Sequence, residues 1–252
     1  MNITGNTILI TGGGSGIGRA LAEALHARGN QVIISGRRET VLDAVTEANP
    51  GMASLLVDMQ DKADIEGFAR DALARFPALN VVINNAGIMK DEDVTATDAH
   101  LAVAEETVVT NLLGPIRLTA TLLPHLLKQP RATVMTVSSG LAFVPLAVTP
   151  TYSATKAAIH SYSMSLRQQL KDTSTQVIEI APPYVQTELR GPEQAVDPLA
   201  MPLADFIAEV MTILETQADV AEVIVERCKP LRFAAENGNL GAVFGMVNSQ
   251  HA

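Results

Sequence analysis

The chain has 252 residues, of which 47% are hydrophobic and 18% charged, so it can bury a large core and is not globally disordered. Its net charge of −9 argues against nucleic acid as a partner, because phosphate backbones are bound by basic surfaces. Cys228 is the only cysteine, which excludes an intrachain disulfide and is typical of a reducing, cytoplasmic setting.

Two further classes of protein are disfavoured by the pattern of residues. No segment approaches the roughly 20 continuous apolar residues of a membrane-spanning helix, and the N-terminus lacks the pattern of a signal peptide. The 5 histidines have no metal-ligand spacing, so we expect no metal. We therefore expect a cytoplasmic protein that acts without a membrane.

Short β-branched runs alternate with longer helical patterns along the chain. Strands that are apolar on both faces, with helices between them, predict an α/β fold. Specifically, we expect a doubly wound parallel sheet (a Rossmann fold) of six or seven strands, with helices on both faces and the ligand at the carboxyl ends of the strands. Strands are expected at 7–11, 31–35, 54–57, 81–84, 133–137 and 177–181, and helices at about 16–28, 38–49, 61–75, 98–128 and 152–171.

The long helix over 98–128 contains Gly114-Pro115, which predicts a kink there. Residues 1–252 are interpreted as a single domain. Residues 190–204 are rich in proline and polar side chains, and a helical pattern then resumes to about Lys229. Two interpretations of this region remain: a substrate lid at about 188–215, or a plain surface loop. From Phe233 onward the chain resembles a loop and a short helix, which leaves a seventh strand undecided.

A glycine-rich turn follows the first predicted strand and opens a helix. Gly12, Gly16 and Gly18 would permit a tight turn and let the backbone approach a pyrophosphate at the helix N-terminus. A turn with only a packing role is the alternative. At the end of the second strand, Ser35-Gly36-Arg37-Arg38 offers two guanidiniums and no carboxylate, which favours the 2′-phosphate of NADP(H) over NAD(H). The alternative is a solvated helix start.

Tyr152 and Lys156 are four residues apart, so one helical face carries both a phenol and an ammonium. We expect the ammonium to lower the pKa of the phenol, which is ordinarily about 10. A nucleotide cofactor beside an acid–base tyrosine indicates an oxidoreductase.

Motifs along residues 5–190 resemble those of the short-chain dehydrogenase/reductase family. Thr11 to Gly18 is similar to its Thr-Gly-x-x-x-Gly-x-Gly turn, and Asn84-Asn85-Ala86-Gly87 to its Asn-Asn-Ala-Gly stretch. Ser139 lies thirteen residues before Tyr152, the usual spacing of the family's catalytic serine. Pro182-Pro183 departs from the family's Pro-Gly and removes one amide donor.

The resemblance implies specific residues for catalysis and for cofactor binding. The implied catalytic residues are Asn111, Ser139, Tyr152 and Lys156. The implied cofactor-binding residues are Gly12, Gly14, Ser15, Gly16, Ile17, Gly18, Arg37, Arg38, Asp58, Met59, Asn85, Ala86, Gly87, Tyr152, Lys156, Pro182, Val185 and Thr187.

The resemblance also implies a role for several of these residues in catalysis or in holding the cofactor. Tyr152 exchanges a proton with the substrate oxygen, Ser139 orients that oxygen, and Lys156 binds the nicotinamide ribose. Asn111 holds a water that links Lys156 to solvent. Asp58 would hold the adenine amino group, and Val185 and Thr187 the carboxamide.

The leading hypothesis is an NADP(H)-dependent enzyme that interconverts a ketone or aldehyde and an alcohol. Apolar stretches at 140–146 and 184–201 would flank the nicotinamide and favour an apolar ketone or alcohol. A 3-oxoacyl-thioester reductase and a non-catalytic nucleotide-binding sensor on the same fold are the alternatives. The resemblance also suggests a homodimer or homotetramer.

Overall fold

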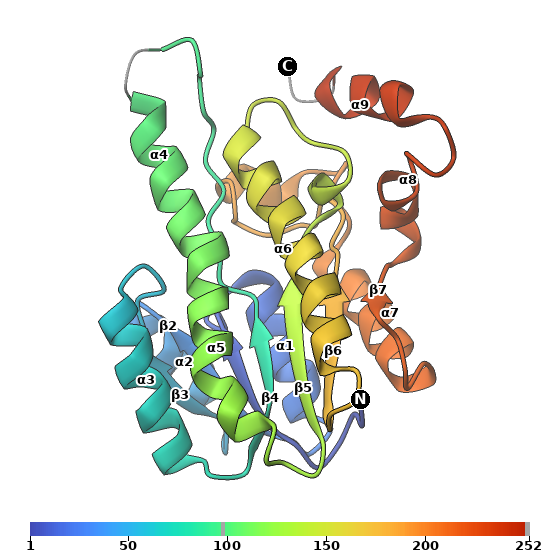
Figure 1. Cartoon of the computed structure of the whole chain (residues 1–252). Helices are drawn as coiled ribbons and strands as arrows, with labels where there is room; N and C mark the ends of the chain where they lie inside the picture. Colours follow the sequence, from blue (N-terminus) through green and yellow to red (C-terminus); the bar gives the residue numbers. More distant parts are fainter. Residues whose placement is uncertain (97–98, 250–252) are drawn as a thin grey trace.

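The computed structural model describes residues 1–96 and 99–249. Within these residues, seven parallel strands form one sheet in the order β3-β2-β1-β4-β5-β6-β7 (Figure 1). The strands are β1 (Thr7–Thr11), β2 (Gln31–Gly36), β3 (Ala53–Leu56), β4 (Leu79–Asn84), β5 (Ala132–Val137), β6 (Thr175–Ile180) and β7 (Glu222–Val223). The strand order reverses between β1 and β4, so the predicted doubly wound parallel fold is confirmed, with seven strands.

Helices cover both faces of the sheet. They are α1 (Gly16–His26), α2 (Glu39–Ala48), α3 (Lys62–Arg75), α4 (Ala99–Val108), α5 (Gly114–Leu126), α6 (Pro150–Leu170), α7 (Leu203–Thr216), α8 (Lys229–Arg232) and α9 (Leu240–Ser249). The predicted start of the long helix at Asp98 lies outside the described residues. None of the helices in residues 1–96 and 99–249 is both long enough and apolar enough to cross a bilayer.

Alternation of side chains along the strands divides the core into two layers. Ile8 and Ile10 of β1 pack with α1, α2 and α7, whereas Leu9 faces the opposite way and packs with α3, α5 and α6. Both layers are continuous sets of buried aliphatic side chains. A central strand buried on both sides explains why its sequence is apolar throughout.

The predicted kink at Gly114-Pro115 takes a different form. The helix continues from α4 to α5 through a π-helical turn, Val109–Leu113, directly before Gly114 (Figure 1). Pro115 has no backbone N–H to donate, so this continuous helix lacks one intrahelical hydrogen bond there. Gly114 packs closely on Met59, where an added Cβ would lie 2.8 Å from the Met59 carbonyl oxygen. The irregularity is therefore a widened turn within the helix.

The structure corrects the predicted helix that was to resume and reach Lys229. The α7 helix ends at Thr216, and the two-residue strand β7 follows on the edge of the sheet. Phe206, Val210 and Leu214 of α7 are buried in the core, so this part of the predicted lid at 188–215 is a core helix. The part of the predicted lid that precedes α7 is residues 188–202.

Candidate functional site

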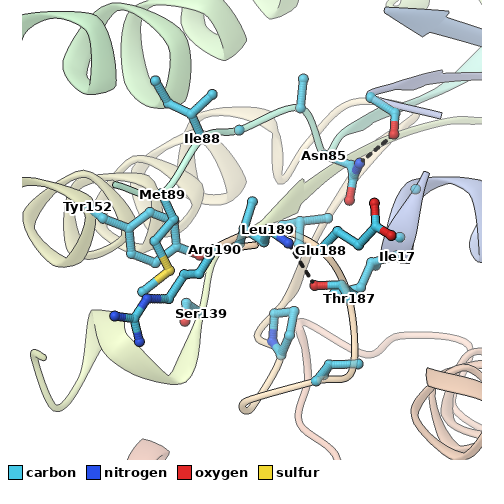
Figure 2. Close-up of a pocket in the computed structure, with 18 of the residues that line it drawn as sticks. Ile17, Asn85, Ile88, Met89, Ser139, Tyr152, Thr187, Glu188, Leu189 and Arg190 are labelled. Carbon is cyan, nitrogen blue, oxygen red and sulfur yellow. Dashed lines mark hydrogen bonds between the residues drawn. The ribbon is translucent and has the colours of Figure 1, made fainter. Parts of the chain in front are cut away.

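A cleft of about 1220 Å³ lies at the carboxyl ends of the strands. Its lining includes every residue that the sequence assigned to the cofactor, together with Ser139, Tyr152 and Lys156. Asn111 is the exception, because it does not line the cleft. Figure 2 shows Ile17 and Asn85 toward one end of the cleft and Tyr152, Ser139, Met89 and Arg190 toward the other. One continuous space therefore joins the glycine-rich turn to the tyrosine.

The glycine-rich turn is closed by contacts that leave no room for side chains. Gly12 has a φ of +67°, and a Cβ on it would lie 2.9 Å from the Cα of Ala86. A Cβ on Gly18 would lie 2.3 Å from the Gly12 carbonyl oxygen. Asn85 holds the turn from the other side, because its Nδ2 donates to the Thr11 carbonyl oxygen at 2.9 Å. The glycines are required for packing, and the same packing brings the turn to the cleft.

The N-terminus of α1 fits an anionic group such as a pyrophosphate. Residues Gly16 to Gly18 line the cleft, and within the described parts of the chain their backbone N–H groups make no hydrogen bond. The first turn of α1 contains no acidic residue, and the cap residue Ser15 makes no side-chain capping bond. These free donors and the helix dipole favour negative charge at this position.

Two guanidiniums stand at the carboxyl end of β2. Arg37 and Arg38 are exposed and line the cleft, and among residues 1–96 and 99–249 neither forms an ion pair. Asp58, at the end of β3, accepts a hydrogen bond from the Gln60 backbone N–H at 3.0 Å. The cleft wall at this end thus combines free cations with one carboxylate that is partly engaged.

Ser139, Tyr152 and Lys156 are brought together at the other end of the cleft. Their exposed fractions are 8%, 6% and 5%, so all three are buried within the cleft wall. Tyr152 lies in the first turn of α6, which starts at Pro150, and Ser139 follows β5. Ser139 hydrogen-bonds Tyr152, and its Oγ also accepts from the Leu141 backbone N–H at 3.1 Å. Lys156 Nζ lies 5.4 Å from the centroid of the Tyr152 ring.

The expected lowering of the Tyr152 pKa is wrong for this structure. Burial raises the pKa of Tyr152 to about 12, and the hydrogen bond from Ser139 opposes this rise only in part. Burial also lowers the pKa of Lys156 to about 8, against an upward effect of the Glu179 carboxylate. Desolvation is the largest cause of both shifts, because both charged forms lose water inside the wall. The phenol is therefore neutral at pH 7.

Asn111 lies in the π-helical turn, behind the loop that follows β4. Its Oδ1 accepts from the Ile88 N–H at 2.9 Å and its Nδ2 donates to the Ile88 carbonyl oxygen at 2.8 Å. Asn111 and Lys156 share a neighbour, because an added Cβ on Gly87 would lie 3.2 Å from Asn111 Oδ1 and 3.7 Å from Lys156 Nζ. The side chain fixes the loop, and the relay through a bound water stays a prediction.

The segment after β6 follows a defined path despite its second proline. All peptide bonds in the described residues are trans, and the Pro182 carbonyl oxygen accepts from the Gly140 N–H at 2.8 Å. Gln194 Nε2 donates to the Val185 carbonyl oxygen at 2.8 Å and to Thr187 Oγ1 at 3.1 Å. This bonding holds residues 185–194 as a closed loop against the cleft.

Sequence reasoning missed the residues that complete the Tyr152 end of the cleft. They come from the C-terminal arm, residues 229–249, which comprises α8 and α9 and lies at the end of the molecule toward which the strands point (Figure 1). Val144, Leu146, Val243 and Val247 form a small apolar cluster there. The arm's contributions to the cleft are Pro230, Leu231, Met246 and Val247. Only the apolar pattern of residues 240–247 could have signalled a buried face.

An ion pair crosses the mouth of this end. Arg190, beyond β6, bonds both carboxylate oxygens of Asp91, beyond β4, at 2.9 and 3.0 Å. Arg190 is therefore engaged with a residue of the chain itself. No group of three or more His, Cys, Asp or Glu in residues 1–96 and 99–249 could hold a metal ion.

Comparison with known proteins identifies the family. The family described as short chain dehydrogenase matches residues 6–197. The uncharacterized oxidoreductase DltE of Bacillus subtilis (strain 168) is 48% identical over 189 residues, which cover 75% of each chain.

Two solved structures are similar over nearly the whole length. A short-chain dehydrogenase from Streptomyces avermitilis has a TM-score of 0.82 and 26% identity, over 94% of this chain and 95% of that one. A short chain dehydrogenase from Burkholderia cenocepacia J2315, solved in complex with NADP, has a TM-score of 0.80 and 26% identity, over 97% and 99%. The chain is therefore an oxidoreductase that belongs to the short-chain dehydrogenase/reductase family.

Proposed function

We propose that the chain is an NADP(H)-dependent carbonyl reductase that interconverts a ketone or aldehyde and an alcohol. The observation that carries this proposal is the convergence of Ser139, Tyr152 and Lys156 at the end of a cleft whose other end is the glycine-rich turn. When bound, the nicotinamide cofactor supplies or accepts the hydride. The chain's own residues must then manage the charge on the substrate oxygen.

Tyr152 is suited to donate a proton to that oxygen. With a pKa of about 12, the phenol is protonated throughout the neutral range, which fits reduction at pH 7. Ser139 can orient the oxygen beside it. Lys156, with a pKa of about 8, is mostly an ammonium at pH 7 and can bind ribose hydroxyls or stabilise developing negative charge.

The preference for NADP(H) is supported by two features. Arg37 and Arg38 are unpaired cations at the edge of the cleft, where a 2′-phosphate would neutralise them. The Burkholderia cenocepacia relative was solved in complex with NADP. We infer the same cofactor class here, held by the free N–H groups of α1 and by the two arginines.

The substrate we propose is apolar. Met89, Leu141, Leu146 and Leu231 line the Tyr152 end, and the guanidinium of Arg190 there is paired with Asp91. Arg227 also lines the cleft, and its guanidinium donates to the Leu199 carbonyl oxygen at 2.7 Å. We also keep the prediction of a cytoplasmic homodimer or homotetramer, which light scattering would test.

Tyr152→Phe is the decisive variant. It removes the proton donor and keeps the ring, so we expect turnover to fall by about three orders of magnitude or more while NADPH binding changes little. The loss of turnover is measured as NADPH oxidation with a panel of apolar ketones. The retained cofactor binding is measured as NADPH affinity by fluorescence. Turnover by Tyr152→Phe would show that another group is the acid. Tight NADPH binding without turnover of any ketone by the unsubstituted protein would instead favour a nucleotide sensor.

A further inference from the structure

A buried carboxylate interrupts the apolar layer behind the proposed active site. Glu179 lies on β6 and has an exposed fraction of 0%. Two residues earlier on the same strand, Val177 packs in the apolar layer that contains α6. Alternation places Glu179 on that same face of the sheet. A carboxylate in such a layer needs partners, because burying an unpaired charge is costly.

Both oxygens of Glu179 have partners. Ser138 Oγ donates to Oε1 at 2.5 Å, and His160 Nδ1 lies 2.8 Å from Oε2. The His160 ring is packed in turn edge-to-face on Phe143, with 4.8 Å between the ring centroids. The carboxylate is therefore fixed in position by β5 on one side and by α6 on the other.

The same strand end carries the catalytic groups. Lys156 Nζ donates to the Val137 carbonyl oxygen at 2.8 Å, Ser138 is bonded to Glu179, and Ser139 faces Tyr152. Lys156 and His160 are four residues apart on α6 and share a helical face. The catalytic ammonium and the buried carboxylate are thus held at neighbouring residues, Val137 and Ser138, directly before Ser139.

The other ionisable groups around Glu179 are either neutral or bonded to other parts of the chain. On β7, Glu222 is its register partner, but Arg232 of α8 pairs with that residue at 2.6 Å. Burial raises the pKa of the Cys228 thiol to about 12, so this neighbour is neutral. Arg167, farther along α6, donates to the backbone oxygens of Val177 and Ala221. Within residues 1–96 and 99–249, the groups of α6 that act on Glu179 are His160, through its hydrogen bond, and the Lys156 ammonium.

Building on the proposed function, we propose that Glu179 is a positioning residue, whose fixed charge keeps Lys156 an ammonium and whose bond to Ser138 fixes the strand end that carries Ser139. The sign of the effect follows from the burial of both groups. Burial lowers the pKa of Lys156 to about 8, and Glu179 opposes that change. Without the carboxylate the pKa would fall further, and the ammonium would be lost near neutral pH.

Glu179→Gln tests the charge directly. The substitution keeps the shape and a hydrogen-bond acceptor for Ser138. In protein labelled with ¹³C-lysine, without NADP(H), the resonance that Lys156→Met removes reports the titration of Lys156. We expect its midpoint to move down by about one pH unit in Glu179→Gln. The control is Ser163→Ala, which removes the bond between Ser163 Oγ and Thr136 Oγ1 (2.7 Å) in the same β5–α6 layer and should leave the midpoint unchanged.

Turnover gives the second readout. Reduction requires the ammonium, so the alkaline limb of kcat/KM should move to lower pH in Glu179→Gln and stay in place in Ser163→Ala. An unchanged Lys156 midpoint in folded Glu179→Gln overturns the proposal. The titration needs no turnover, so an inactive protein with a shifted midpoint would refute the reductase and leave the role of Glu179 standing.

Glu179→Asp decides the matter if Glu179→Gln does not fold. Aspartate keeps the charge but is one methylene shorter, so it cannot span from Ser138 to His160. We expect an unshifted Lys156 midpoint together with kcat several-fold lower and KM for NADPH unchanged. A shifted midpoint, or a kcat equal to that of the unsubstituted protein, would overturn the proposal.

Discussion

The glycine-turn end of the cleft is tightly packed backbone with two arginine side chains at its edge, whereas the Tyr152 end is formed by side chains from several segments. Gly12, Gly18 and the free N–H groups of α1 come from one short stretch after β1, and their packing tolerates no added atoms. The Tyr152 end is assembled from β5, α6 and the C-terminal arm, which lie far apart in the sequence. The two ends should therefore respond differently to substitution: changes at the glycine-turn end should alter cofactor affinity, and changes at the Tyr152 end should alter substrate affinity.

Gly18→Ala should have the largest effect of the three substitutions, because it disturbs the packing of the glycine-rich turn. Its Cβ would lie 2.3 Å from backbone oxygen of Gly12, so the turn must shift. We expect the free energy of unfolding to fall by about 1–3 kcal/mol and NADPH binding to weaken more than about tenfold. Urea unfolding and NADPH titration measure the two effects. Gly245→Ala is the matched control, because a Cβ there meets nothing within 4 Å and alanine is the better helix former. Unchanged stability and unchanged NADPH affinity in Gly18→Ala would contradict the conclusion that the packing of this turn tolerates no added atoms.

Val247→Asp should disturb the apolar wall at the Tyr152 end of the cleft. Val247 is a buried residue of α9 that lines the apolar wall, and a carboxylate there would be poorly solvated. We expect KM for apolar ketones to rise by about tenfold while the Kd of NADPH stays unchanged. Phe244→Asp, on an exposed position of the same helix, should alter neither quantity. If Val247→Asp changed cofactor binding instead, the two ends would not be separable.

Arg37→Ala should have the smallest effect of the three substitutions, because it removes one guanidinium and leaves the packing of the glycine-rich turn intact. We expect the ratio of kcat/KM for NADPH to that for NADH to fall by about fivefold or more, since one charge-assisted contact to the 2′-phosphate is lost. Steady-state kinetics with both cofactors measure the ratio. Arg28→Ala, which removes a guanidinium paired with Glu215, is the control. An unchanged ratio would mean that Arg37 is only a solvated helix start.

Most of the sheet could be predicted from the sequence, since the first six strands are short, largely apolar runs, and all of them except the edge strand β3 are mostly buried. The seventh could not, because β7 is two residues long and follows a helix whose apolar pattern continues across it. The π-helical turn before Gly114 could be predicted only as an irregularity, because Gly114-Pro115 indicates a kink without specifying its form.

What the sequence determined by itself is the set of local motifs: the glycine-rich turn, the two arginines after β2, and the spacing of Tyr152 and Lys156. Local motifs are readable because their chemistry depends on neighbours a few residues away. Tertiary structure alone decided the protonation of Tyr152, the apolar wall from α9 and the bonding of Glu179, because burial and long-range contact set desolvation. A spacing of four residues brings phenol and ammonium together, but the water that both lose is a property of the whole fold.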